Sequence, residues 1–577
     1  MAPPNTSADS SASSSSAKAE SSSRPSQPKT PRSLADPIAR TALRYSMSAR
    51  EYATLHKYVI SRSRLLKRAA PSVSTVEKII DGNRAHLARK ESREGRAGAA
   101  GDDYNVRAVR HAIRVFLATG SLMKLYTIVS RKLSRTDKDV QTTKKQPFHK
   151  SDTFRLSLSL STILLLYRLL FRFFTRFRAH LLDPTAAPFR ARNPRTAATL
   201  TSPYAPAIGA SLAGLMLGIY PAKQLRVSIA LFAIFRALEF SWNMCEEEGL
   251  IWGLKPGGKG KRERPWWFGS WMLQPFAFGQ LLHAVVFDRD CFPMPFGNFI
   301  FGNSSTYLHG RPKEYPAHIK WPGTYNIVDS LAEMAKLNWP PFTSPILFPD
   351  KETLPSTLSA VAPLTSTAHP LITSLSCATL HPSDPSCLRT YLTFWLRSFP
   401  PLARFFLIFY SALTLPRLRL LYHNPVATLN RLLARALRSS TFITGSISTA
   451  WASICVFQTW FPKSFLATQR FFIGGFLAGL WAWVERRSCR GAFLYTTKAS
   501  VDSLWKVGVK RRWWRGMKGG DVWVFVLALM ATGVVYERDR KAIKEANWRK
   551  GVSWVRGEGF RDWSVEEDEL VEEEDSA

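Results

Sequence analysis

A short segment of the chain gathers residue types that bind metal ions. Cys377, His381 and Cys387 lie close together in the sequence, and His369 precedes them. Thiolate and imidazole groups are typical zinc ligands, taken four at a time in a tetrahedron. The spacing matches no common zinc finger, and prolines interrupt the segment. Three interpretations stay open: a metal site, a Cys377–Cys387 disulfide, and a rigid loop without chemistry. We therefore name Cys377, His381 and Cys387 as metal candidates but assign no bound metal or other cofactor.

A second pattern could support catalysis. His283 and Asp288 are separated by four residues, the spacing found in glycerolipid acyltransferases. There the histidine acts as a general base toward an acceptor hydroxyl, and the aspartate orients it. Two fixed positions in six residues make a weak pattern. We favour a polar contact at the end of a helix, because the equivalent positions of the second repeat unit, about Thr532 and Glu537, do not keep the histidine. We therefore predict that the chain is not an enzyme and assign no catalytic residue.

Two segments, 255–267 and 506–518, interleave Lys and Arg with Trp. Protein grooves that bind nucleic acid combine basic side chains with aromatic rings that stack on the nucleobases. The same residue types also anchor membrane helices at the lipid headgroups. Both segments lie beside apolar stretches, so lipid phosphate is the nearer polyanion. We therefore predict contacts with anionic lipid and no nucleic-acid partner. The residues assigned to these contacts are Arg262, Arg264, Trp266, Trp267, Lys510, Arg511, Arg512, Trp513, Trp514 and Arg515.

Composition narrows the classes of protein that can position these residues. The chain has 577 residues, a formal net charge of +36 and 45% hydrophobic residues. A disordered polycation would lack such apolar content, and six cysteines are too few for a disulfide scaffold. The excess of bases then points to nucleic acid or to an anionic membrane surface, and the apolar segments favour the membrane.

Apolar segments recur along the chain, several of them near the lower length limit for crossing hydrocarbon. Aromatic and basic residues crowd their ends, as expected for helices anchored at a membrane interface. The sequence therefore predicts membrane helices rather than the buried helices of a soluble protein. The segments are 156–174, 205–220, 227–244, 268–287, 442–461, 471–484, 492–507 and 522–536.

The chain also contains an internal repeat. Three pairs of short segments match in the same order, and the match extends outward to neighbouring helices. We infer two parallel units, 106–290 and 388–540, each with one Arg-bearing helix and about four short membrane helices. Whether the Arg-bearing helices span or lie in the interface stays open. The matching pairs are 208–215 with 473–480, 264–269 with 512–516, and 285–290 with 534–539.

Small residues recur at matching positions in the second helix of each unit. Ala210, Gly214 and Gly218 share one helix face, as do Gly475 and Gly479. Such faces let helix backbones approach closely in lipid. Close packing matters there because burial of apolar groups contributes little free energy to helix association within a bilayer. We assign these five residues to helix packing.

Several short motifs follow one another in order between about 370 and 540. They are Cys377-Ala-Thr-Leu-His381, Pro385-Ser-Cys387, Phe442-Ile-Thr, Val484-Glu-Arg-Arg-Ser-Cys-Arg-Gly491, Leu494-Tyr495, Val507-Gly508-Val509 and Gly520-Asp-Val522. These motifs resemble the transmembrane protein 135 family, the first two its cysteine-rich opening. The block from Pro265-Trp-Trp-Phe-Gly-Ser-Trp271 to Trp339-Pro-Pro-Phe342 resembles the fungal branch of that family. The Gly-rich helices are distantly similar to import-channel subunits of the mitochondrial inner membrane.

The resemblance implies a multi-pass protein of peroxisomal or mitochondrial membranes, with roles in membrane organisation and in lipid or solute handling. A translocation channel and a glycerolipid acyltransferase are the alternatives. Expected partners are anionic membrane lipids, a second copy of the chain, or other membrane proteins. The predicted fold is all-α and polytopic. Its parts are a disordered tail (1–38), a basic helix and linker (39–105), the first unit (106–290), a Pro-rich connector with one short helix at 327–337 (291–387), the second unit (388–540), and a polar end with an acidic tail (541–577).

Overall fold

The computed structural model describes residues 45–58, 60–62, 71–76, 99–133, 150–255, 262–312, 315–316, 320–349, 354–415 and 422–565. The predicted N-terminal tail and most of the acidic tail lie outside these residues. The chain divides into two compact units, Met1–Ala118 and Thr119–Ala577. The described secondary structure is helical, which confirms the all-α prediction.

In the first unit, α2 (Ala49–Tyr58) and η2 (Ile60–Arg62) form a small cluster. Tyr52, Ile60 and Val76 are its buried side chains. The Tyr52 hydroxyl donates to the carbonyl of Pro71 at 2.6 Å, which satisfies the polar end of a buried ring. This cluster falls within the segment predicted as a basic helix and linker.

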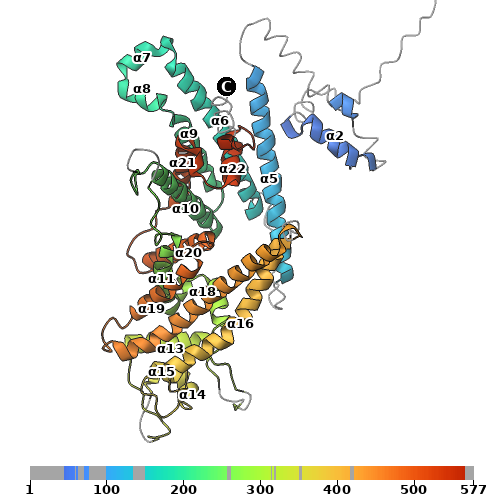
Figure 1. Cartoon of the computed structure of the whole chain (residues 1–577). Coiled ribbons are helices and arrows are strands. Elements are labelled where there is room, and N and C mark those ends of the chain that lie inside the picture. The colour runs from blue at the N-terminus through green and yellow to red at the C-terminus, as the bar shows by residue number, and fades with distance from the viewer. Residues whose placement is uncertain are drawn as a thin grey trace, which may run out of the picture. The chain divides into compact units, whose positions relative to one another are not determined.

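The second unit is built from long helices joined by short helical turns (Figure 1). Its long helices are α6 (Asp152–Leu182), α10 (Gln224–Glu247), α11 (Leu273–Phe287), α16 (Cys387–Thr414), α18 (Pro425–Trp460), α20 (Arg490–Lys510) and α21 (Gly520–Arg538). Two elements change type along their length: α9 (Ala205–Ser211) continues as the 3₁₀ helix η5 (Leu212–Ile219), and α19 (Arg470–Gly479) continues as η10 (Leu480–Glu485). The helix α5 (Ala99–Leu133) contributes to both units by its position in the chain.

Four of the described helices are long and apolar enough to cross a membrane. They are the Tyr104–Ser130 part of α5, α6, α18 and α21. A fifth crossing results if α8 (Pro194–Thr201) and the Ala205–Ile219 helix, bent by 81° from it, count as one span. The structure thus supports candidate membrane spans but fewer than the eight predicted.

The missing spans have a physical explanation. The 15 residues of α11 rise about 22 Å, short of the roughly 30 Å of a hydrocarbon core, and α19 is shorter still. The helices α10 and α20 are longer but carry charged residues within them, such as Glu239 and Lys498. The Arg-bearing helix of the first unit, whose placement the sequence left open, lies in α5, and its Tyr104–Ser130 part is long and apolar enough to span.

The helices of the two predicted repeat units pack crosswise. The helix α11 contacts α19 and α20, whereas α21 contacts α9, η5 and α10. An ion pair supports the second group of contacts, because Arg226 at the start of α10 binds Asp521 at the start of α21, at 2.9 Å between Nη2 and Oδ1. Both side chains are largely buried, so loss of one partner would leave the other charge without its counterion.

The connector contains more structure than the sequence predicted. The short helix predicted at 327–337 is present as α13 (Thr324–Lys336). In addition, α12 (Met294–Gly302), η8 (Ser356–Val361), α14 (Ala362–Thr365) and α15 (Leu375–Leu380) form. Their apolar side chains join the largest hydrophobic core together with residues of α11, α18 and α19. The connector is therefore a packed part of the second unit.

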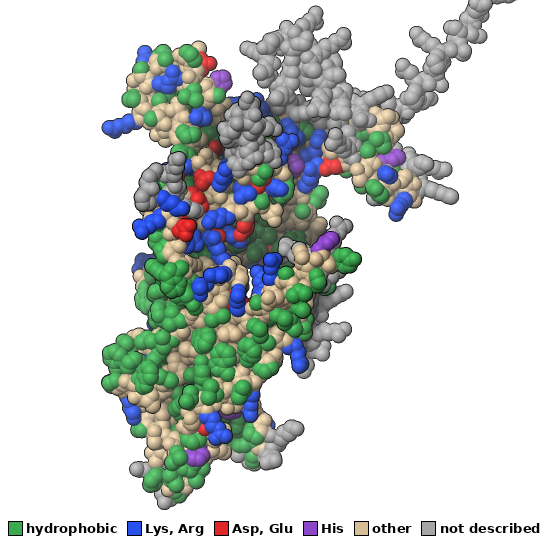
Figure 2. Space-filling view, in the orientation of Figure 1, with side chains coloured by type: hydrophobic (Ala, Val, Ile, Leu, Met, Phe, Trp, Pro, Cys, Tyr) green, Lys and Arg blue, Asp and Glu red, His purple; other side chains and the backbone are tan. Residues whose placement is uncertain are grey.

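Apolar side chains dominate one part of the surface of the second unit (Figure 2). They gather over α11, α16, α18 and α19, whereas charged side chains concentrate near α10 and α22 (Ala546–Arg556). On α16, Leu388, Leu392 and Leu396 are all more than half exposed and follow one helix face. A surface of this extent needs an apolar environment, which agrees with the candidate membrane spans.

We predict that alkaline carbonate leaves the full-length protein in the membrane pellet, because the candidate spans and the exposed apolar face favour lipid over water. Sedimentation followed by immunoblotting measures the distribution. A peripheral protein of the same membrane serves as the extraction control. Release of the chain together with that control would contradict a polytopic membrane protein.

Glycine lets α11 and α19 cross with their backbones in contact. A Cβ atom at Gly479 would lie 2.6 Å from the carbonyl oxygen of Gln274, and one at Gly279 would lie 2.8 Å from the carbonyl oxygen of Phe472. Gly475 faces the backbone of Phe278 in the same way. Helix backbones that approach this closely have no room for a side chain.

Gly479→Leu should therefore force α11 and α19 apart and destabilise the protein by about 1–3 kcal/mol or more, as overpacking does elsewhere. Gly491→Leu is the matched control, because a Cβ atom at Gly491 meets no described atom within 4 Å. The midpoints of thermal unfolding of the two variants are compared in detergent, with unfolding monitored by size-exclusion chromatography. Equal midpoints would show that the crossing tolerates a side chain.

Candidate functional site

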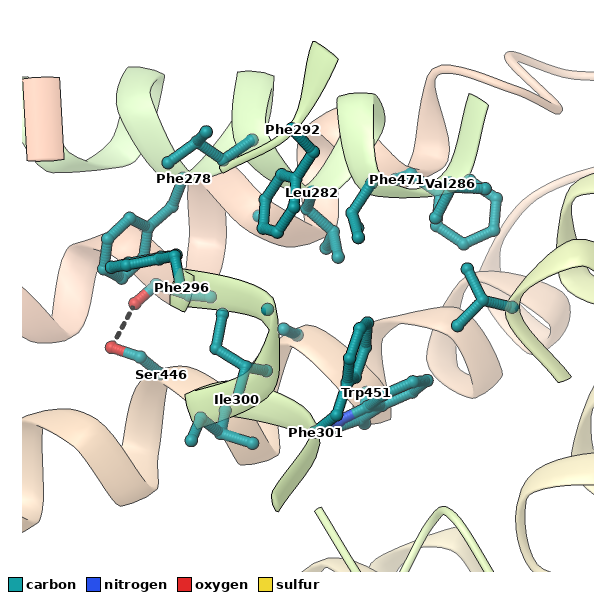
Figure 3. Close-up of a pocket in the computed structure, with 18 of the residues that line it drawn as sticks. Phe278, Leu282, Val286, Phe292, Phe296, Ile300, Phe301, Ser446, Trp451 and Phe471 are labelled. Carbon is teal, nitrogen blue, oxygen red and sulfur yellow. Dashed lines mark hydrogen bonds between the residues drawn. The ribbon is translucent and has the colours of Figure 1, made fainter. Parts of the chain in front are cut away.

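The crossing of α11 and α19 forms one wall of an apolar cavity of about 120 Å³ (Figure 3). The helices α12, α13 and α18 supply the other walls. Phe278, Leu282, Phe296, Ile300 and Trp451 point toward the central space. The first two belong to α11, the next two to α12, and the last to α18. The cavity therefore depends on helices from both predicted units and on the connector.

The few polar atoms of the cavity wall are hydrogen-bonded. The Ser446 hydroxyl donates to the carbonyl oxygen of Ala478 at 3.0 Å. The Trp451 indole N–H donates to the Ser304 hydroxyl at 2.9 Å. With these groups satisfied, the cavity offers water no partners, and apolar cavities of this kind stay dry and accept apolar guests.

The short helix α12 connects the cavity to the surface of the second unit. Its residues Phe296 and Ile300 face the cavity, whereas Met294 is exposed. Phe299 both lines the cavity and is exposed. An apolar helix with one face toward a cavity and another toward the outside is suited to a lipid environment. Hydrocarbon outside the protein thus borders the same helix that closes the cavity.

A cluster of four potential metal ligands lies one helical turn beyond this cavity. Cys377 lies within α15 and His381 directly follows this helix, Cys387 begins α16, and Cys455 comes from α18. Their ligand atoms all lie within 4.8 Å of one another. Cys455 is 1% and His381 2% exposed. The structure thus brings together the three residues named from the sequence and adds Cys455, whereas His369 is not part of the group.

Contacts within the cluster shift the pKa values of two of its members. Hydrogen bonds with the Cys377 and Cys455 thiols, and then with His381, hold the pKa of Cys387 well below its usual range. Burial lowers the pKa of His381, but contacts with the Cys377 and Cys387 sulfurs outweigh burial and raise it to about 10. All six cysteines are free in this structure.

The predicted headgroup residues are only partly available to lipid. Arg264 forms an ion pair with Glu246 at 2.5 Å, and Lys510 and Arg511 bind carboxylates at the end of α11. Trp514 stacks on Trp505 with ring centroids 5.5 Å apart. All ten predicted residues except Trp514 are exposed, but Arg264, Lys510 and Arg511 are also held by carboxylates. The exposed residues outside these ion pairs are Arg262, Trp266, Trp267, Arg512, Trp513 and Arg515. A reduced set of the assigned residues can thus face headgroups.

No hydrogen bond joins His283 to Asp288 in the part of the chain that the structure describes. Asp288 is buried and accepts from Arg511 at 2.6 Å, with Lys510 at 3.5 Å. His283 instead packs against Phe287, with ring centroids 4.8 Å apart. The carboxylate thus joins the end of α11 to the end of α20, and the interpretation as a helix-end polar contact fits this geometry.

Comparison with known proteins adds no further assignment. No family model matches the chain, and neither a curated protein nor a solved structure matches it. The resemblance to the transmembrane protein 135 family therefore stays a prediction that rests on the quoted motifs.

Asp288→Asn should lower the thermal stability of the protein, because Arg511 would lose its anionic partner at a partly buried position. Hydrogen bonds to charged groups contribute about 1.5–3 kcal/mol, and the partial exposure of Arg511 places the effect at the lower end. Asp290→Asn is the matched control, since Asp290 is mostly exposed. Thermal unfolding in detergent measures both; an equal effect would contradict a special role for Asp288.

Proposed function

We propose that this chain is a multi-pass organelle membrane protein that holds the acyl chain of a membrane lipid in the cavity between α11, α12, α13, α18 and α19. The observation that carries the proposal is the almost entirely apolar wall of that cavity, whose polar side-chain groups on Ser446 and Trp451 form hydrogen bonds within the protein. The resemblance to the transmembrane protein 135 family supports a peroxisomal or mitochondrial membrane and a role in lipid handling.

Energetics favour an occupant for this cavity. An acyl chain that fills the space restores the lost dispersion contacts of the wall. In a bilayer such chains are abundant on the outer side of α12. The gain therefore comes from packing rather than from removal of hydrocarbon from water.

Headgroup contacts extend the proposal to the anionic lipids expected from the sequence. Arg512 and Arg515 are exposed in the loop that follows α20, next to the exposed Trp513. Bases near an anionic membrane surface contribute about 1 kcal/mol each, and Trp prefers the interface. This loop can therefore hold the end of α20 at the headgroups while the cavity accepts a chain.

Two tandem related units remain our proposal for the architecture. In both, the second element starts as an α-helix and ends as a 3₁₀ helix, at η5 and at η10. The fourth helix of each unit, α11 or α21, packs on the second element of the other unit. Two similar units related by an approximate twofold axis would pack in this reciprocal way.

The two alternatives have less support. A translocation channel would need polar groups along the Gly-rich helices, but Gly475 and Gly479 face the backbone of α11, and Gly214 faces side chains of α21. An acyltransferase would need a hydrogen bond between His283 and Asp288, but the Asp288 carboxylate binds Arg511. Close packing thus accounts for the first pattern and a structural ion pair for the second.

Ala450→Leu tests the cavity, because Ala450 lines it on α18 and a larger side chain would occupy the space. We expect this variant to lose most of its labelling by a phospholipid that carries a photoreactive diazirine in its acyl chain. Ala427→Leu, the same change at an exposed position of α18, should label like the wild type. Labelling is measured by mass spectrometry on full-length protein in lipid nanodiscs.

The labelled peptides provide a second measurement. Adducts should map to α12 and to the 443–454 part of α18. As a control for folding, Ala450→Leu should show a cooperative thermal unfolding transition. Equal labelling of the two variants, or adducts only on the outer surface of α16, would reject an acyl chain in the cavity.

A further inference from the structure

We infer that Cys377, His381, Cys387 and Cys455 bind one zinc ion with tetrahedral geometry, in a closed structural site. The inference rests on the positions of four ligand atoms that converge from three elements of the second unit. It is independent of the lipid cavity, because its evidence lies in the ligands alone.

Three of the six separations between the ligand atoms match those that a tetrahedral zinc ion imposes, and all six are within 4.8 Å. With Zn–S bonds of about 2.3 Å and Zn–N bonds of about 2.0–2.1 Å, two sulfurs lie about 3.8 Å apart and a sulfur and a nitrogen about 3.5–3.6 Å apart. The Sγ atoms of Cys377 and Cys387 are 3.8 Å apart. His381 Nε2 lies 3.4 Å from Cys387 Sγ and 3.5 Å from Cys455 Sγ.

The histidine is oriented as a metal ligand. Its Nδ1–H donates to the carbonyl oxygen of Asp384 at 2.7 Å, and Nε2 is directed at the sulfurs of Cys387 and Cys455. Such a contact with the other ring nitrogen is typical of zinc-bound histidine, where it fixes the tautomer and the ring orientation. The backbone turn after α15 supplies the acceptor, so the loop itself positions the ligand.

The thiolates required by zinc also find support in the fold. Cys387 is the first residue of α16, next to the N-cap Ser386. The N-terminus of a helix carries a partial positive charge and stabilises an anion placed there. Zinc bound by three thiolates and one neutral imidazole leaves a net charge of about −1, and this helix end offsets part of it.

The donor set favours zinc over other metals. Three sulfurs and one imidazole nitrogen suit zinc, whereas calcium and magnesium take oxygen ligands. Four protein ligands fill the tetrahedron and leave no position for a substrate, which is the arrangement of structural rather than catalytic zinc. The ion would link the connector and the start of α16 to the far end of α18.

Metal analysis of the full-length protein, purified in detergent without chelator, tests the site. We expect about one zinc per chain in the wild type and a loss of most of it in Cys455→Ser. The matched control Cys489→Ser should keep its zinc, because Cys489 is a free cysteine outside the cluster. Growth with cobalt in place of zinc should give the visible absorption bands of tetrahedral, thiolate-bound Co²⁺.

Alkylation keeps the test valid if Cys455→Ser fails to fold. In the wild-type protein, Cys377, Cys387 and Cys455 should resist a maleimide until a zinc chelator is added, and added zinc should restore their protection. Three results would overturn the inference. The first is zinc well below one equivalent together with a Cys377–Cys387 disulfide, and the second is iron in the purified protein. The third is equal zinc content in folded Cys455→Ser and Cys489→Ser.

Discussion

The contact between the backbones of α11 and α19 is the constraint on which most of the second unit depends. Gly279 and Gly479 remove the side chains that would otherwise separate the two helices. Because α11 comes from the first predicted repeat unit and α19 from the second, this contact joins the halves of the chain. It also sets the width of the cavity, since both helices contribute wall residues to it.

The cavity and the Cys/His cluster are neighbours on α18. Trp451 lines the cavity, and Cys455 follows one turn later. A bound ion at the cluster would hold this end of α18 against the connector, whose α12 and α13 form the other cavity walls. A cavity can persist only where its walls cannot collapse. The proposed metal site therefore offers a reason why the void beside it does not close.

The sequence predicted features that depend on local pattern and missed those that depend on distant contacts. Apolar periodicity and flanking Trp identified the helices, and the short spacing of Cys377, His381 and Cys387 identified three members of the cluster. Cys455 could not be linked to them, because it lies in an apolar helix far along the chain and no spacing rule connects the two. Likewise, the partners of Arg511 and Lys510 on α11 depend on tertiary packing, so these bases were assigned to lipid. Segment length overestimated the number of spans, because 3₁₀ breaks and internal charges cannot be seen from average apolarity.

The Cys/His cluster also fixes the route of the chain through a bilayer. Cys387 begins α16 and Cys455 lies near the end of α18, yet their side chains meet, so the two helices run antiparallel as a hairpin. If α18 crosses the membrane, α16 must traverse the same depth in the opposite direction, despite Arg397, Arg404 and its paired prolines. The number of crossings between the two cysteines is then even. All four ligands would face a single compartment, and the protein could draw its ion only from the pool on that side.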